Sequence, residues 1–453
     1  MIGFDQDVTI LKQRTELAAP ISVSPKWGHG DNALEIWMRR LLDRRSTLAL
    51  LAACGSHYAL SDAQAAVVAR DQPSSPFVRR VVRGPINSYS TYPHANGFLP
   101  DGRCLVARPS TVRGRAGLDY LAIDFSSGDI EPIASVAAAR TYFAVSENGL
   151  LAIPKTFGVA LIDLESPSRT EKQILSEPGW TVAEDLDISP DGSKILVARS
   201  HYAKPQGFEA STIVTAGGKL DRILHPSWQI DHAHFSPYAP SWICYAQNVR
   251  PPQRSTHRMW VWNARSAPNG RNIFDQVNDD GKTYVVSHER AMFHKAALLT
   301  IAHGSSAATP RGLYEVGFDG QRRLISESNR DFHCNISRDG RWAVVSLQGS
   351  ADEQVSGVSA AFRGIQTPAR PPSGWLKETG AGAFDISDIQ LVDIHTGKRA
   401  FLFRATNAVS GQPYEVQPAI SPDGKWVVFK DARARCAMAV EIDQGTLNRF
   451  LSA

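Results

Sequence analysis

The chain has 453 residues, of which 43% are hydrophobic and 21% are charged, and its formal net charge is +4. This length and composition predict a soluble, folded protein with a large core and exclude a multi-span membrane protein. The chain has no dense run of Lys and Arg of the kind that predicts a nucleic-acid partner. Its mildly basic net charge instead suits an acidic sugar polymer as partner.

Residues 38–70 have the layout of an export signal. A basic start is followed by the short apolar run 48–53 and then by small residues. Arg44 and Arg45 resemble a twin-arginine signal, and the sequence LAAC ending at Cys54 resembles a lipoprotein cleavage site. We therefore expect an exported, periplasmic protein, with Cys54 as the candidate lipid anchor. Residues 1–37 are interpreted as a non-native extension before a true start at Met38. A short buried helix is the alternative interpretation of the apolar run.

Four further cysteines, Cys104, Cys244, Cys334 and Cys436, lack the paired spacing of a structural zinc site. We expect them to be buried small side chains rather than a disulfide framework, because a chain of this length does not need cross-links to fold.

One hairpin pattern recurs from about residue 75 onward: a short apolar strand, a turn of the Ser-Pro-Asp-Gly type, and a second apolar strand. Asp-Gly and Asn-Gly accept the positive φ of a tight hairpin turn, and the flanking runs are rich in Val, Ile and Leu. The copies are residues 97–108, 187–199, 234–246, 335–347 and 419–431, with a weaker copy at 144–154.

Second strand pairs lie between these hairpins, for example at 312–325 and 389–403. Each unit thus holds about four strands in roughly 45 residues, which is the period of a propeller blade. The sequence predicts an all-β protein, a seven-bladed β-propeller with WD40- or TolB-like blades over residues 75–453. Residues 349–384, rich in Ala, Gly, Pro and Ser, are predicted to form an insertion loop between blades.

Polar residues recur at one position of these hairpins. His232, His333 and Gln417 each lie four residues before the serine of the turn, so they occupy equivalent inner-strand positions of three blades. Apolar residues would fill a propeller centre equally well, and buried polar groups without partners cost free energy. The pattern therefore indicates a site. For each residue alone, a hydrogen-bonded strand side chain is the alternative.

Four stretches of the chain resemble the oligogalacturonate lyases. They are HAHFSPYAPSWICYAQNVRPPQRSTHRMWVWN from His232, HERAMFHKAALLTI from His288, HCNISRDGRWAVV from His333 and QPYEVQPAISPDGKWVVFKD from Gln412. They stand in the family's order and fall within about residues 180–445. The resemblance implies a seven-bladed propeller that cleaves oligogalacturonides by β-elimination with a divalent metal, commonly Mn²⁺.

β-Elimination needs a positive group and a base. The proton next to a uronate carboxylate is weakly acidic until a cation or an arginine neutralises the carboxylate, and a base then removes it as the glycosidic oxygen leaves. The resemblance implies three groups of residues: catalytic His232 and Arg258; substrate-binding His333, His234 and Arg199; and metal-binding His288, Gln412, Glu415 and Gln417. Glu415 and Gln417 stand where the family has histidines, so the implied metal site has altered ligands.

Two alternatives stay open at this point. A non-catalytic periplasmic propeller that binds a glycan or a protein would account for the altered metal ligands, and a lyase for another uronate polymer, such as ulvan, would keep the same chemistry. A prolyl-oligopeptidase-like hydrolase is excluded, because no Gly-x-Ser-x-Gly turn or hydrolase domain follows the repeats. We expect an acidic oligosaccharide as partner, no nucleic acid, no transmembrane domain, and a monomer or simple homo-oligomer.

Overall fold

The computed structural model describes residues 75–204, 207–248, 256–348, 384–408, 413 and 415–452. The predicted N-terminal extension (1–37), the predicted export signal (38–70) with Cys54, and residues 349–383 of the predicted insertion lie outside the described residues. Within the described ranges, none of the helical structure has the length and hydropathy that a membrane span requires.

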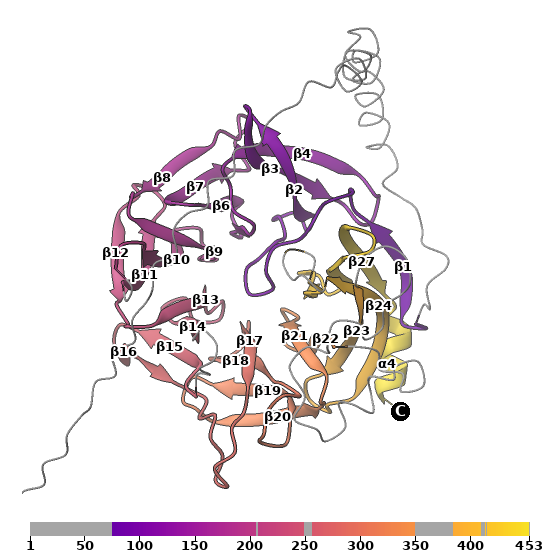
Figure 1. Cartoon of the computed structure of the whole chain (residues 1–453). Coiled ribbons are helices and arrows are strands. Elements are labelled where there is room, and N and C mark those ends of the chain that lie inside the picture. The colour runs from indigo at the N-terminus through magenta and orange to yellow at the C-terminus, as the bar shows by residue number, and fades with distance from the viewer. Residues whose placement is uncertain are drawn as a thin grey trace, which may run out of the picture. The chain divides into compact units, whose positions relative to one another are not determined.

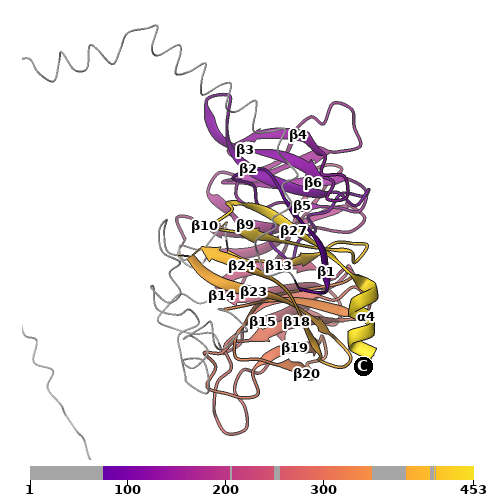
Figure 2. The same ribbon diagram turned by 90° about the vertical axis from the view of Figure 1, so that its right-hand side faces the viewer.

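Seven antiparallel sheets follow one another around a common axis (Figure 1), which confirms the predicted seven-bladed β-propeller. Viewed from the side, the blades overlap as successive layers of strands (Figure 2). We number the blades in chain order. Blade 1 contains β2 (Cys104–Val112), β3 (Arg115–Ile123) and β4 (Ile130–Ala137). Blade 2 contains β5 (Ala144–Val145), β6 (Leu150–Lys155), β7 (Gly158–Asp163) and β8 (Lys172–Ser176). Blade 3 contains β9 (Trp180–Ile188), β10 (Lys194–His201), β11 (Phe208–Val214) and β12 (Leu220–Leu224).

The remaining blades each have four strands. Blade 4 contains β13 (Gln229–Phe235), β14 (Ile243–Asn248), β15 (Met259–Asn263) and β16 (Ala267–Asn272). Blade 5 contains β17 (Val286–Ala291), β18 (Ala297–Ala302), β19 (Gly312–Gly317) and β20 (Arg322–Glu327). Blade 6 contains β21 (Asp331–Ile336), β22 (Trp342–Leu347), β23 (Phe384–Asp393) and β24 (Arg399–Ala408). Blade 7 contains β25 (Ala419–Ile420), β26 (Trp426–Asp431), β27 (Cys436–Ile442) and β1 (Val78–Arg83).

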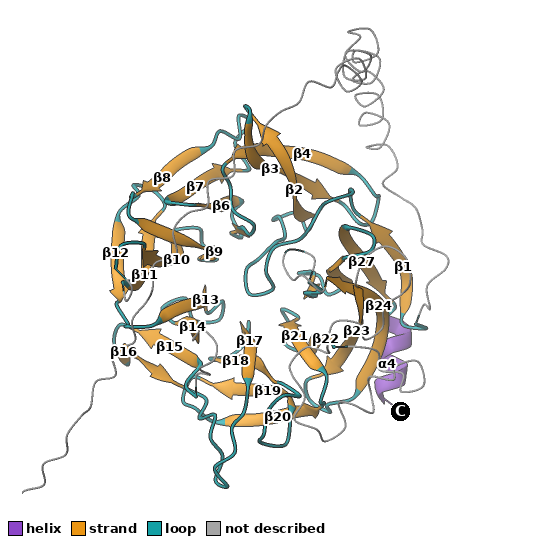
Figure 3. Ribbon diagram, in the orientation of Figure 1, coloured by secondary structure: helices purple, strands orange, loops and turns teal. Residues whose placement is uncertain are grey.

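The ring is closed by pairing strands from distant parts of the chain. In blade 7, β1 is the outer strand and pairs with β27, with Val81 opposite Val440. A nine-residue helix, α4 (Gln444–Ser452), follows β27 on the outside of this blade (Figure 3). The side-chain carboxylate of Asp443 accepts the backbone N–H of Thr446 at 3.0 Å, which is the arrangement of an N-cap.

The Ser-Pro-Asp-Gly turns form a recurrent hydrogen-bond network, which explains why these residues repeat. In blade 3, the Ser189 hydroxyl donates to the Asp191 carboxylate at 2.6 Å and accepts the backbone N–H of Lys194 at 3.0 Å. Gly192 has φ of 70°, which is unfavourable for residues with a Cβ. Ser337 and Ser421 repeat these contacts in blades 6 and 7.

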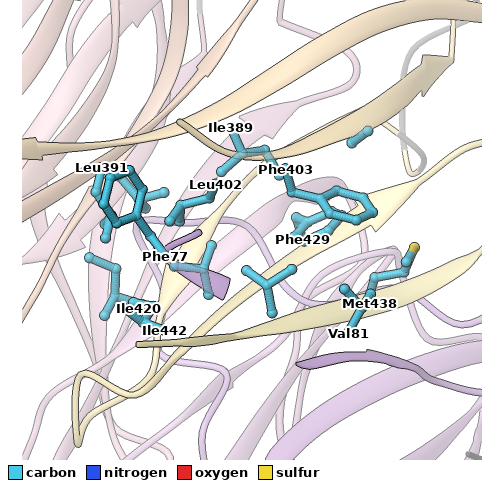
Figure 4. Close-up of a cluster of buried hydrophobic side chains, with 14 of the residues drawn as sticks. Phe77, Val81, Ile389, Leu391, Leu402, Phe403, Ile420, Phe429, Met438 and Ile442 are labelled. Atoms are coloured by element: carbon cyan, nitrogen blue, oxygen red, sulfur yellow. The ribbon is translucent and has the colours of Figure 1, made fainter. Parts of the chain in front are cut away.

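Adjacent blades pack through apolar side chains. Between blades 6 and 7, the rings of Phe403 and Phe429 are 5.2 Å apart, and Phe77 packs in the same cluster (Figure 4). The second strands of the blades are buried on both faces in this way, so strands such as β18 (ALLTIA) and β22 (WAVVSL) are mostly apolar runs, whereas the outer strands β12, β16 and β20 are largely polar. The four cysteines of the described chain are free and buried, as predicted.

Candidate functional site

Equivalent inner-strand positions of all seven blades lie four residues before the first residue of each hairpin turn. That first residue donates its backbone N–H across the turn in every blade: Leu99, Ser146, Ser189, Ser236, Met292, Ser337 and Ser421. The equivalent positions are Ala95, Tyr142, Asp185, His232, His288, His333 and Gln417. Six of the seven residues are polar. The count that selected His232, His333 and Gln417 also selects Tyr142 and Asp185, which the sequence analysis missed.

Backbone irregularities place the imidazoles of blades 4 and 5. His232 and His288 have φ of 51° and 59°, in the left-handed region, and the strand register shifts at both positions. A bulge redirects a side chain, and a non-glycine residue in this region costs about 1–3 kcal/mol. The surrounding structure therefore holds these two rings in place against local strain.

The segment between β1 and β2 adds two aromatic side chains to this position. It runs toward the centre of the ring in Figure 1. Tyr92 Oη is 3.0 Å from Nδ1 of His288, and its ring centroid is 4.8 Å from those of both His94 and His232. We call these side chains together the axial cluster, which consists of Tyr92, His94, Asp185, His232, His288, His333 and Gln417.

His232 lies between carboxylates. Its Nδ1 is 3.2 Å from Oε1 of Glu289, its Nε2 is 3.9 Å from Oδ2 of Asp231, and its backbone N–H donates to Oδ2 of Asp185 at 3.0 Å. Burial lowers the pKa of His232, but Asp231 and Glu289 more than offset it and raise the pKa to about 9. Without a bound cation this ring is protonated at neutral pH, so it can donate a proton but cannot accept one.

His288 and His333 differ from His232 in charge. Their ring centroids are 3.9 Å apart, and Nε2 of His333 is 4.0 Å from Oε2 of Glu415. Burial holds the pKa of both rings well below the usual value for histidine, with Lys430 adding to the effect on His333. Neither ring nitrogen of His333 has a hydrogen-bond partner within the part of the chain that is described. His333 is therefore a neutral imidazole whose ring nitrogens make no hydrogen bond to a described residue.

Lys430, on β26, contacts the axial cluster from blade 7. Its fully buried ammonium donates to Oε1 of Gln417 and lies 5.1 Å from the centroid of the Tyr142 ring. Burial lowers the pKa of Lys430 to about 7, against the opposing effect of Glu415. Lys430 therefore carries positive charge beside Gln417 only below about pH 7, at the place where the sequence resemblance implied a metal.

Three of the four expected metal ligands, His288, Glu415 and Gln417, lie among the described residues. Gln412 lies outside the described residues, the carbonyl oxygen of Gln417 accepts from Lys430, and Nδ1 of His288 contacts Tyr92. Among described residues, three groups of the metal-ligating type do converge elsewhere: Asp185, Asp231 and His232 each place one ligand atom within 4.8 Å of the others. His288 and Glu415 belong to no such group in the described ranges.

Of the other expected site residues, Arg258 and His234 lie beside the axial cluster, whereas Arg199 lies within blade 3. Burial raises the pKa of Glu289, but His232 and, to a smaller extent, Arg258 lower it to about 2, so Arg258 lies near this carboxylate. His234 is fully buried; its Nδ1 is 2.7 Å from the His232 carbonyl, and its Nε2 accepts the Ala291 N–H at 3.1 Å, so both nitrogens are occupied. Arg199 donates to Glu209 and Glu177 and covers a tryptophan ring within blade 3.

A separate pocket lies toward the hairpin turns. Its lining includes Asp187 and Arg290. Each lies on an inner strand, two residues after a member of the axial cluster and two residues before the first residue of the hairpin turn. The guanidinium of Arg290 donates to the His94 carbonyl, so it also holds the segment between β1 and β2 in place.

Fold and site together define a seven-bladed propeller with a buried polar cluster on its axis. No protein-family profile matches the chain, and no curated protein matches it in sequence. Its structure is similar to that of an oligogalacturonate lyase from Vibrio parahaemolyticus, with 14% identity, a TM-score of 0.63, and coverage of 84% of this chain and 97% of that chain. It is also similar to an oligogalacturonate lyase in complex with manganese, with 14% identity, a TM-score of 0.63, and coverage of 85% and 99%. At this identity the likeness shows the fold alone.

Proposed function

We propose that this protein is a lyase-like propeller that cleaves uronate-containing oligosaccharides by β-elimination at the axial cluster. The observation that carries the proposal is that the protonated ring of His232 and the neutral rings of His288 and His333 stand at equivalent positions of neighbouring blades, with Lys430 beside Gln417. Oligogalacturonides are the first substrates to test, because the fold is shared with two oligogalacturonate lyases.

The positive groups have a defined task in this chemistry. Lys430 in its charged form would pair with the uronate carboxylate, which makes the proton on the neighbouring carbon more acidic. Asp231 and Glu289 flank His232 and would repel the carboxylate there, and Arg258 partly offsets the charge of Glu289. His232, His288 and Arg258 are only partly buried, so we place the entry of the sugar on their side.

His333 is the proposed base. Its ring is neutral and both its nitrogens lack hydrogen-bond partners in the described part of the chain, so it would take the proton next to the carboxylate. The electron pair left on that carbon forms the new double bond as the bond to the glycosidic oxygen breaks.

Tyr92 is the proposed acid. Burial, with the charge of Glu289, raises the pKa of its phenol well above the usual value, so the hydroxyl stays protonated. The contact with Nδ1 of His288 orients the hydroxyl, which would donate a proton to the departing glycosidic oxygen.

The test is an ultraviolet absorbance assay for the unsaturated uronate product. We expect absorbance to rise with oligogalacturonides, and His333→Gln to lower the rate by about 100-fold or more. His225→Gln, at an exposed histidine outside the cluster, is the matched control, and circular dichroism checks that both variants fold. Saturable binding with no absorbance rise, across several uronate polymers, would instead support the non-catalytic binding propeller.

A further inference from the structure

We infer that Asp185, Asp231 and His232 form a binding site for a divalent first-row transition metal, between blades 3 and 4. One ligand atom from each lies within 4.8 Å of the other two, which a small adjustment around a shared cation would close. None of the three proposed ligands belongs to the set His288, Gln412, Glu415 and Gln417 that the sequence resemblance implied.

Each proposed ligand is oriented by a second group, as metal ligands in proteins usually are. Nδ1 of His232 is 3.2 Å from the Glu289 carboxylate, which leaves Nε2 directed to Asp231. The Asp231 carboxylate accepts from the Asn248 amide at 2.8 Å, and the Asp185 carboxylate accepts the backbone N–H of His232 at 3.0 Å. A carboxylate on the far nitrogen of a histidine fixes the ring and strengthens it as a ligand.

An unpartnered imidazole also faces this group. His94 is almost fully buried, its Nε2 is 3.8 Å from Oδ2 of Asp185, and neither of its ring nitrogens has a hydrogen-bond partner among the residues described. Buried polar atoms normally have a partner. A water molecule on a metal held by three protein ligands would supply one.

The local charge favours a cation here. Three carboxylates, those of Asp185, Asp231 and Glu289, surround one imidazole, and Glu289 is almost fully buried. Two carboxylate oxygens with an imidazole nitrogen suit Mn²⁺ or Zn²⁺, whereas Mg²⁺ and Ca²⁺ prefer all-oxygen sites. Three protein ligands leave a position open, which is typical of catalytic rather than structural sites.

The experiment uses the purified full chain, stripped of metal with a chelator and titrated with Mn²⁺ while paramagnetic resonance reports the free aqueous ion. We expect saturation at one Mn²⁺ per chain and competition by Zn²⁺ but not by Mg²⁺. Asp231→Asn and Asp185→Asn should each weaken binding by more than about 10-fold, and Glu289→Gln by about 10- to 100-fold.

Two controls separate this site from its neighbours. Asp187→Asn changes another buried carboxylate on the same strand, which accepts the Phe235 N–H, and should leave Mn²⁺ affinity unchanged. Gln417→Leu should also leave it unchanged. Thermal melts identify any variant that fails to fold. If Asp231→Asn fails to fold, Asp231→Glu replaces it, and this variant should also weaken Mn²⁺ binding.

The inference is overturned if the wild type shows no saturable binding, if folded Asp231 and Asp185 variants bind as the wild type does, or if Gln417→Leu abolishes binding. Because no substrate is present, this result is independent of the lyase assay. If the protein binds Mn²⁺ at this site but forms no unsaturated product, the metal site is supported and the proposed lyase function is wrong.

Discussion

Replacing Lys430 with methionine should change the pH dependence of stability in a defined direction. The ammonium is fully buried and contacts Gln417, and burial lowers its pKa from 10.5 to about 7. In the unfolded chain the pKa of a lysine is about 10.4. Between pH 7 and about pH 10, therefore, the unfolded chain holds a proton that the folded chain has lost, and the free energy of unfolding of the wild type rises with pH.

The magnitude follows from the pKa shift. One pH unit is worth about 1.4 kcal/mol, so the penalty of the charged, buried lysine is roughly 5 kcal/mol below pH 7. Between pH 6.5 and pH 9.5, the wild type should gain about 3 kcal/mol relative to Lys430→Met. Methionine fills a similar volume but leaves the Gln417 carbonyl without its donor, an offset of about 1–3 kcal/mol that does not depend on pH.

Urea unfolding of both proteins across this pH range measures the effect as a difference, so groups common to both cancel. Lys282→Met, at a lysine with a 60% exposed side chain, is the control, and we expect its unfolding free energy to run parallel to the wild type. Parallel curves for wild type and Lys430→Met would refute the reasoning, because they would mean that Lys430 keeps its hydration in the folded protein.

Three further predictions concern packing, the repeated turn and the proposed acid. Phe429→Ala should lower the free energy of unfolding by about 3–5 kcal/mol, measured by urea denaturation, because its fully buried ring packs between two blades. Ser421→Ala should lower it by about 1–2 kcal/mol in the same assay, because the hydroxyl makes two hydrogen bonds in its turn. Tyr92→Phe should lower kcat for uronate cleavage by about 10²- to 10⁴-fold with little change in KM, and an unchanged kcat would exclude it as the acid.

The fold was predictable because its information is local and repeated. Each Ser-Pro-Asp-Gly turn carries its own hydrogen-bond network, and copies of it mark the blades along the chain. Blade 1 is the exception. Its inner strand is reduced to isolated bridges at Tyr89 and Phe98, because the segment between β1 and β2 turns toward the axis instead of pairing along its length. Closure of the ring by β1 depends on a contact across nearly the whole propeller and leaves no local signal.

The site was predictable where it follows the repeat. The four-residue count finds His232, His333 and Gln417, and applied to every hairpin it also finds Asp185 and Tyr142. Tyr92 and His94 lie in a segment that repeats nowhere, so no count leads to them.

Lys430 could have been found from hairpin register. Ala419 pairs with Val428, and continuing that register by two residues places Gln417 opposite Lys430 on the same face. The resemblance concerns residues before the turn, whereas Lys430 lies on the strand after it.

The axial cluster is electrically divided, and this division gives each half a different use. Asp185, Asp231 and Glu289 gather around His232 on one side, and Lys430 lies beside Gln417 on the other, with the neutral rings of His288 and His333 between them. When Lys430 is protonated, a uronate carboxylate is attracted to the lysine side, whereas a divalent cation is attracted to the carboxylate side. Because the neutral rings lie between the two, a sugar held by its carboxylate at Lys430 would present its acidic proton to His333. A metal between Asp185 and Asp231 would then act on a different part of the same ligand.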